Sequence, residues 1–176
     1  DQFITHCFMP SVQNIDQVAS ARKMDIMAAN CYHGQQDDLT GNEIAFAGDY
    51  FRSVKQDNYL ITETNAQTIG WNSMIQQPPY PGQMRQNVYA HIGSGANMVE
   101  YWHWHSIHYG QEIYWKGVLS HDLKPNRAYE DVSKTAHELK RFGKKIVNLK
   151  KKNDVAILFS HDSNDALNFM PFNGSG

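Results

Sequence analysis

Glu63 is the residue whose type and position point most clearly to chemistry. It follows the apolar run Tyr59–Ile61, which predicts a buried strand that ends near Thr62. A carboxylate at the exit of a buried parallel strand occupies the usual place of a catalytic residue in a barrel of alternating strands and helices. The alternative interpretation of the same position is a solvated loop acid.

Glu63 could act as one half of a pair of carboxyl groups. Retaining glycosidases use two such groups about 5–5.5 Å apart, one as the nucleophile and one as the acid/base. Trp71, in the loop after the expected strand, could offer an apolar platform to a sugar ring. Glu112, in a later loop, could bind sugar hydroxyls through charge-assisted hydrogen bonds. A surface loop acid is the alternative for Glu112.

The segment Trp102–His108 is rich in histidine. His103 and His105 alternate, so on a strand they would project from one face. Such a pair can bind zinc, with His108 or His121 as a third ligand. No cysteine or carboxylate shows a metal-ligand spacing with them. We therefore expect hydrogen bonding or sugar contact here, and neither a metal nor a cofactor.

The composition limits the classes of protein. The 176 residues are 41% hydrophobic and 19% charged, which is typical of a soluble globular domain. A formal charge of −2 argues against a nucleic-acid or anionic membrane surface, and no apolar run reaches the roughly 20 residues of a membrane helix. Cys7 and Cys31 follow apolar stretches and are expected as buried free thiols. No signal peptide is visible, which favours a cytoplasmic location.

The elements that must position these side chains alternate between strand and helix. Strands are expected at Phe3–Phe8, Met24–Ala28, Asn58–Thr62, Asn97–Trp104 and Asp154–Phe159. Helices are expected at Ile15–Arg22, Asn42–Lys55, Gln83–Gly93 and Arg127–Asn148. Repeated strand–helix units predict a parallel sheet with helices outside. A closed barrel needs eight strands and about 250 residues, so we expect either a fragment or a smaller α/β sheet.

The order and spacing of several segments carry a resemblance to a known family. They are Phe3–Met9, Met24–Tyr32, Ile61–Glu63 through Trp71, Pro81–Arg85, His91–Ala96, and Tyr101–Trp104 through Glu112 to Gly117. Together they resemble the second half of the catalytic barrel of glycoside hydrolase family 42, the β-galactosidases. The matching segments cover most of residues 1–150.

The resemblance implies a fold and a set of site residues. Residues 1–150 would be strands five to eight of a partial (β/α)8 TIM barrel. Residues 151–176 would begin a second α/β domain, which in the family helps to build a trimer. The implied nucleophile is Glu63. The implied sugar-contacting residues, of which the last replaces a histidine of the family, are Tyr32, Trp71, Trp102, Glu112 and Trp115.

The implied function is that of a retaining glycoside hydrolase acting on terminal β-D-galactosides or related oligosaccharides, as a homo-oligomer. The family's acid/base glutamate would precede Asp1, so this chain alone is expected to be inactive. His103 and His105 stand where the family usually has arginine, which leaves the sugar preference open. The alternatives are a non-catalytic carbohydrate-binding module and a barrel glycosidase of different sugar specificity. Half a barrel also leaves two unpaired edge strands, which favour association.

Overall fold

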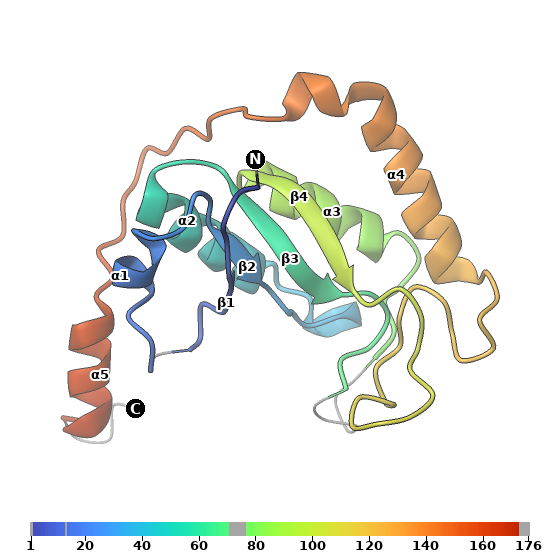
Figure 1. The fold of residues 1–176 in the computed structure, drawn as a ribbon, viewed down its shortest axis with the longest axis horizontal. Coiled ribbons are helices and arrows are strands. Elements are labelled where there is room, and N and C mark those ends of the chain that lie inside the picture. Colours follow the sequence, from blue (N-terminus) through green and yellow to red (C-terminus); the bar gives the residue numbers. More distant parts are fainter. Residues whose placement is uncertain (1, 13, 71–76, 173–176) are drawn as a thin grey trace.

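A computed structural model describes residues 2–12, 14–70 and 77–172. Its centre is a four-stranded sheet in the order β1-β2-β3-β4, in which every neighbouring pair is parallel (Figure 1). The strands are β1 (Cys7–Phe8), β2 (Ala28–Asn30), β3 (Tyr59–Asn65) and β4 (Ala96–Trp102). The α-helices are α1 (Gln17–Ala21), α2 (Asn42–Lys55), α3 (Gln83–Gly93), α4 (Arg127–Ile146) and α5 (His161–Phe169). A short 3-10 helix, η1, spans Gln36–Asp38.

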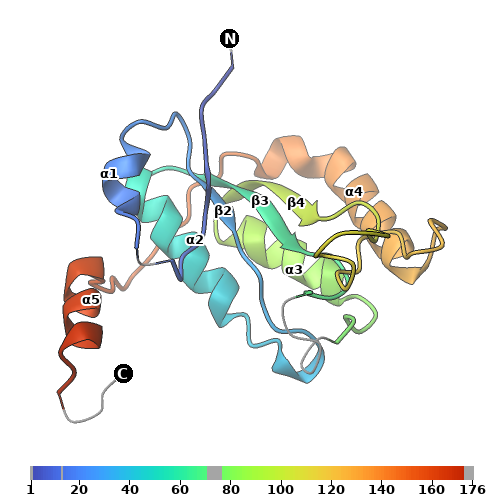
Figure 2. The same cartoon turned by 60° about the horizontal axis from the view of Figure 1, so that its bottom comes forward.

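Helices α2 and α3 lie on the same face of the sheet, as the two views in Figures 1 and 2 show. No helix of the described residues covers the opposite face in these views. This one-sided arrangement is the one expected for a sector of a barrel, in which helices form only the outer ring. None of the described helices has the length and apolar character that crossing a membrane requires.

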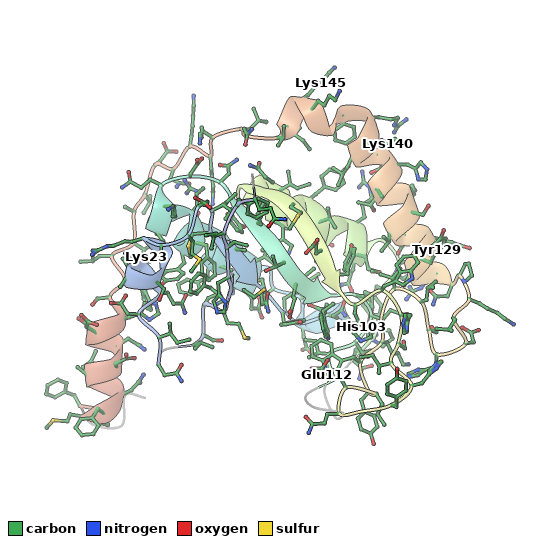
Figure 3. The ribbon with its side chains drawn as sticks, viewed as in Figure 1. Lys23, His103, Glu112, Tyr129, Lys140 and Lys145 are labelled. Carbon is green, nitrogen blue, oxygen red and sulfur yellow. The ribbon has the colours of Figure 1, made fainter. Side chains whose placement is uncertain are left out.

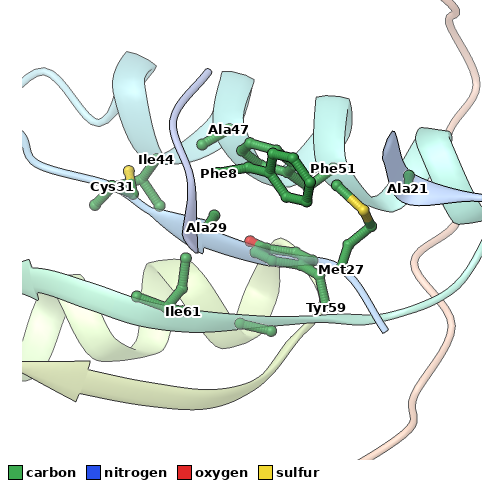
Figure 4. Packing of buried hydrophobic residues seen from close by; sticks show 11 residues of the cluster. Phe8, Ala21, Met27, Ala29, Cys31, Ile44, Ala47, Phe51, Tyr59 and Ile61 are labelled. Atoms are coloured by element: carbon green, nitrogen blue, oxygen red, sulfur yellow. The ribbon is translucent and has the colours of Figure 1, made fainter. Parts of the chain in front are cut away.

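The main core lies between α2 and the sheet (Figure 4). Phe51 and Ile44 of α2 are at most 1% exposed, and they face Tyr59 and Ile61 of β3 and Phe8 of β1. Each such side chain contributes about 1.5–3 kcal/mol when it is fully buried. The apolar spacing of α2 therefore determines which face of the helix meets the sheet.

The helix predictions are largely confirmed. Helices α2 and α3 have the expected bounds, and α4 begins as expected at Arg127 and ends at Ile146. Helix α1 is shorter than expected and is capped by Asp16, whose carboxylate accepts a hydrogen bond from Ala19 N at 2.8 Å. Asn14, a possible cap because it directly precedes the expected helix, does not cap it.

Three strand predictions need correction. Strands β1 and β2 are shorter than expected, and β2 starts only at Ala28. The segment Asp154–Phe159 forms no strand: Ile157 and Leu158 are 91% and 99% exposed. An apolar run becomes a strand only when a neighbouring strand pairs with its backbone, and no described strand lies beside this one. Helix α5, which follows it, was not anticipated; the Ser160 hydroxyl caps it by accepting from Ser163 N.

The two cysteines differ from each other. Cys31 is buried as expected, and burial raises the pKa of its thiol to about 12. Cys7 is exposed, so the expectation of burial was wrong there. Both are free thiols. The raised pKa keeps the thiol of Cys31 protonated, so Cys31 packs as a small apolar side chain and does not act as a nucleophile.

Candidate active site

Strand β3 contains a β-bulge beside Glu63, the candidate catalytic residue. Against β4, Ile61 pairs with Val99 and Thr64 pairs with Tyr101, so β3 has one residue more than its partner over this stretch. Strict alternation would place Glu63 on the same face as Ile61, toward the helices. The extra residue changes that phase, and bulges commonly re-aim a side chain in this way. Glu63 thus lies within β3, and not after its end as the sequence predicted.

The carboxylate of Glu63 is held by Tyr32. The Tyr32 hydroxyl donates to Glu63 Oε2 at 2.5 Å, and Cys31 N donates to Glu63 O at 2.8 Å. Burial raises the pKa of Tyr32, and the hydrogen bond to Glu63 and the charges of Glu63 and Glu112 raise it further. The phenol therefore stays protonated and remains a donor, which fixes one oxygen of the carboxylate.

Aromatic side chains lie near Tyr32 and Glu63. Trp115 is 2% exposed, and its ring meets that of Tyr32 edge-on with centroids 5.1 Å apart. Gly70 makes this position possible, because a β-carbon there would lie 2.0 Å from Trp115 Cδ1. The indole of Trp102, the last residue of β4, donates to Glu112 Oε2 at 3.1 Å. The pairings of Tyr32 with both Glu63 and Trp115, and of Trp102 with Glu112, place five of the six sequence-predicted residues at one end of the sheet.

Glu112 and His103 lie beyond the end of β4, in the long loop that follows this strand (Figure 3). This end is the carboxyl end of the parallel sheet, where barrel enzymes carry their active sites. The sixth predicted residue, Trp71, lies outside the described residues.

The loops after β3 and β4 are joined to each other. Gln67 N donates to Lys116 O at 3.0 Å, and Gln67 Nε2 donates to Gly117 O at 2.7 Å. The buried Ser106 hydroxyl accepts from Gly117 N and donates to Leu119 O, both within 3.2 Å. These bonds fix the loop that carries Glu112 and Trp115, because they join the two sides of the loop to each other and connect its second side to the segment after β3.

The histidine cluster does not form a metal site. Strand β4 ends at Trp102, so His103 and His105 do not alternate on a strand as predicted. His121 Nε2 lies within 3.1 Å of two loop carbonyls, and His108 Nε2 lies 2.6 Å from His121 O. No group of three or more His, Cys, Asp or Glu side chains in the described part of the chain could hold a metal ion. The hydrogen bonds of His108 and His121 instead stabilise the loop.

Two residues of this region were not singled out by the sequence analysis. Gly70 admits Trp115, and Asn65 binds the backbone of His33 on both sides. The only signal for Asn65 was a polar side chain at the end of an apolar strand, which is common on loops as well. Their roles depend on contacts with residues more than 30 positions away.

A parallel sheet with helices on one face, and with carboxylates and aromatic rings at its carboxyl end, has the architecture of a sector of a (β/α)8-barrel glycosidase. The family comparison makes this class specific. The chain belongs to glycoside hydrolase family 42, because the family model described as beta-galactosidase matches residues 1–142.

Individual relatives agree with this assignment. Beta-galactosidase BgaA of Clostridium cellulovorans is 31% identical over 127 residues, which cover 72% of this chain and 19% of BgaA. The solved structure of a catalytic mutant of Gan42B, a β-galactosidase from G. stearothermophilus, superposes with a TM-score of 0.84 at 23% identity, covering 94% of this chain and 26% of that one. The β-galactosidase of Marinomonas ef1 superposes with a TM-score of 0.85 at 20% identity, covering 97% and 29%. The chain thus spans between 19% and 29% of the length of these three relatives.

Proposed function

We propose that this chain is the nucleophile-bearing half of a retaining β-galactosidase barrel, with β1 to β4 as strands five to eight. The observation that carries the proposal is the 2.5 Å hydrogen bond from Tyr32 to Glu63 at the carboxyl end of the sheet. A neutral donor that fixes one oxygen leaves the carboxylate oriented for attack on an anomeric carbon. The family membership and the β-galactosidase relatives support the same reaction.

In the proposed reaction, an oxygen of Glu63 forms a bond to the anomeric carbon as the bond to the leaving oxygen breaks. A carboxylic acid from the other half of the barrel gives its proton to the leaving group and then activates water to release the sugar. Trp102, Glu112 and Trp115, with Trp71, would line the galactose subsite. The carboxylate of Glu112 would accept hydrogen bonds from sugar hydroxyls.

The 176-residue chain alone is expected to be inactive, since general acid–base catalysis supplies roughly 10²–10⁴-fold in rate. Turnover of a nitrophenyl β-galactoside by the chain alone, abolished by Glu63→Gln, would contradict this expectation.

The nucleophile is tested in a chain that carries both barrel halves. Incubation with a 2-fluoro galactoside that has a good leaving group should leave one sugar attached to the peptide containing Glu63, as measured by mass spectrometry. Glu63→Gln should abolish labelling and turnover, whereas Glu130→Gln, on the exposed first turn of α4, should preserve both. Labelling of another carboxylate would refute the assignment. Galactose binding without turnover or labelling would instead indicate a carbohydrate-binding module.

We further propose that residues 151–176 begin a second α/β domain and that the longer protein is a homo-oligomer. The exposed apolar side chains of Ile157 and Leu158 support a covering partner segment in the longer chain. Light scattering of the longer chain measures the number of subunits, and a monomer would refute the second proposal.

A further inference from the structure

A pair of buried histidines lies between α3 and the loop that carries Tyr32. His33 follows Tyr32 in the loop after β2, and His91 lies on α3. Their side chains are 3% and 0% exposed, and their ring centroids are 6.2 Å apart. Among the described residues, neither His33 Nε2 nor either ring nitrogen of His91 has a hydrogen-bond partner. Buried polar atoms of this kind destabilise a fold when they stay unsatisfied, so a role for the pair is expected.

The hydrogen bonds assign the protons of this pair. His33 Nδ1 lies 2.9 Å from Gly34 O, and a carbonyl only accepts, so Nδ1 carries the proton. Burial lowers the pKa of both rings, to about 3 for His91, so both are neutral near pH 7. His33 Nε2 is then an acceptor, and His91 offers one donor and one acceptor. The two rings pack against each other at an interplanar angle of 50° and form no direct hydrogen bond.

The backbone of His33 is also fixed to β3. Asn65 Oδ1 accepts from His33 N at 3.2 Å, and Asn65 Nδ2 donates to His33 O at 3.3 Å. Asn65 is two residues after Glu63 on the same strand. The loop after β2 is therefore held to β3 by the hydrogen bonds between Asn65 and the His33 backbone, and it packs on α3 through the rings of His33 and His91. Tyr32 directly precedes His33 in this loop.

We propose that His33 and His91 are positioning residues that hold Tyr32 Oη against Glu63, with His91 acting through His33. The inference rests on the proposed role of Glu63 as the nucleophile. The two histidines are buried between α3 and the loop after β2. They therefore influence the reaction only by fixing the loop that carries Tyr32. Loss of the link should let Tyr32 turn away from the carboxylate while the strands remain paired.

The first test uses nuclear magnetic resonance on the 176-residue chain. The ¹⁵N shifts of His33 should show the tautomer that is protonated at Nδ1 and unprotonated at Nε2. A slowly exchanging hydroxyl proton of Tyr32 should also be visible. A His33 ring protonated at Nε2 would overturn the proposal without any variant.

The second test uses substitutions at His91. His91→Leu should remove the slowly exchanging Tyr32 proton, and His91→Gln, whose amide keeps one donor and one acceptor in place of the imidazole, should restore it. His137→Leu is the matched control, because His137 is exposed on α4 and its ring bonds to Ser133 O of the same helix. A Tyr32 proton that survives His91→Leu would overturn the proposal.

The third test measures catalysis in a chain that carries both barrel halves. His91→Leu should lower kcat about tenfold, the value of one net hydrogen bond, with KM changed less than twofold and with rescue by His91→Gln. If Glu63→Gln keeps full activity, the proposed function fails. If Glu63→Gln is inactive but His91→Leu keeps the wild-type kcat, only the positioning role fails.

Discussion

Buried, neutral His91 should make this fold sensitive to mild acid. Its pKa is about 3 in the folded chain, compared with 6.5 for the exposed side chain, and desolvation is the main cause. Between these two values the unfolded state binds more protons than the folded state. The free energy of unfolding should therefore fall as the pH decreases from 6.5 toward 3, and it should not depend on this group above 6.5.

The magnitude follows from the two pKa values. At pH 5 the unfolded chain has protonated nearly all of its His91 side chains and the folded chain almost none. The loss at pH 5 relative to pH 7.5 is about 2 kcal/mol from this residue. His33, whose pKa is also lowered by burial, adds to it, with the charge of Glu43 opposing that shift. The ion-paired Asp49 and Asp57 have pKa values lowered from 3.8, so they titrate below this window.

The assay is urea unfolding followed by tryptophan fluorescence at pH 7.5 and pH 5.0. The free energy of unfolding should drop between these values in the wild-type chain, and the drop should be about 2 kcal/mol smaller in His91→Leu. His137→Leu, on exposed α4, should keep the full drop. An equal drop in His91→Leu and wild type would refute the reasoning, because it would mean that His91 titrates normally in the folded chain.

Three further changes have expected outcomes. Tyr32→Phe removes a hydrogen bond to a carboxylate worth about 1.5–3 kcal/mol, so kcat/KM for a nitrophenyl galactoside should fall roughly 10–100-fold in a chain with both barrel halves; an unchanged value would contradict the site. Gly70→Ala forces a β-carbon against the facing indole and should cost about 1–3 kcal/mol in urea unfolding, whereas Gly93→Ala, whose β-carbon meets nothing within 4 Å, should not destabilise. Phe51→Ala, at a fully buried position, should cost about 3–5 kcal/mol by the same measurement, and a loss under 1 kcal/mol would argue against the core described.

The local pattern was sufficient for the three longest helices, α2, α3 and α4. Helix α2 places Ile44, Ala47 and Phe51 three or four residues apart, and all three are at most 1% exposed. That spacing is a property of the helix itself, so its bounds could be predicted without neighbours. The prediction of a strand at Asp154–Phe159 was wrong because a strand depends on a neighbour. It needs a partner strand, which the described residues do not supply.

The sequence by itself determined the parallel strand–helix order, the family and the candidacy of Glu63, because these depend on residue types and their spacing along the chain. Only the tertiary structure decided which way the Glu63 side chain points and which group donates a hydrogen bond to it. The bulge on β3 is defined by its register against two neighbouring strands, and the donor to its carboxylate is Tyr32, 31 positions earlier. The fit of Gly70 against Trp115 and the enclosure of His91 likewise depend on distant segments. Contacts between distant segments form only when the chain packs, so no local pattern records them.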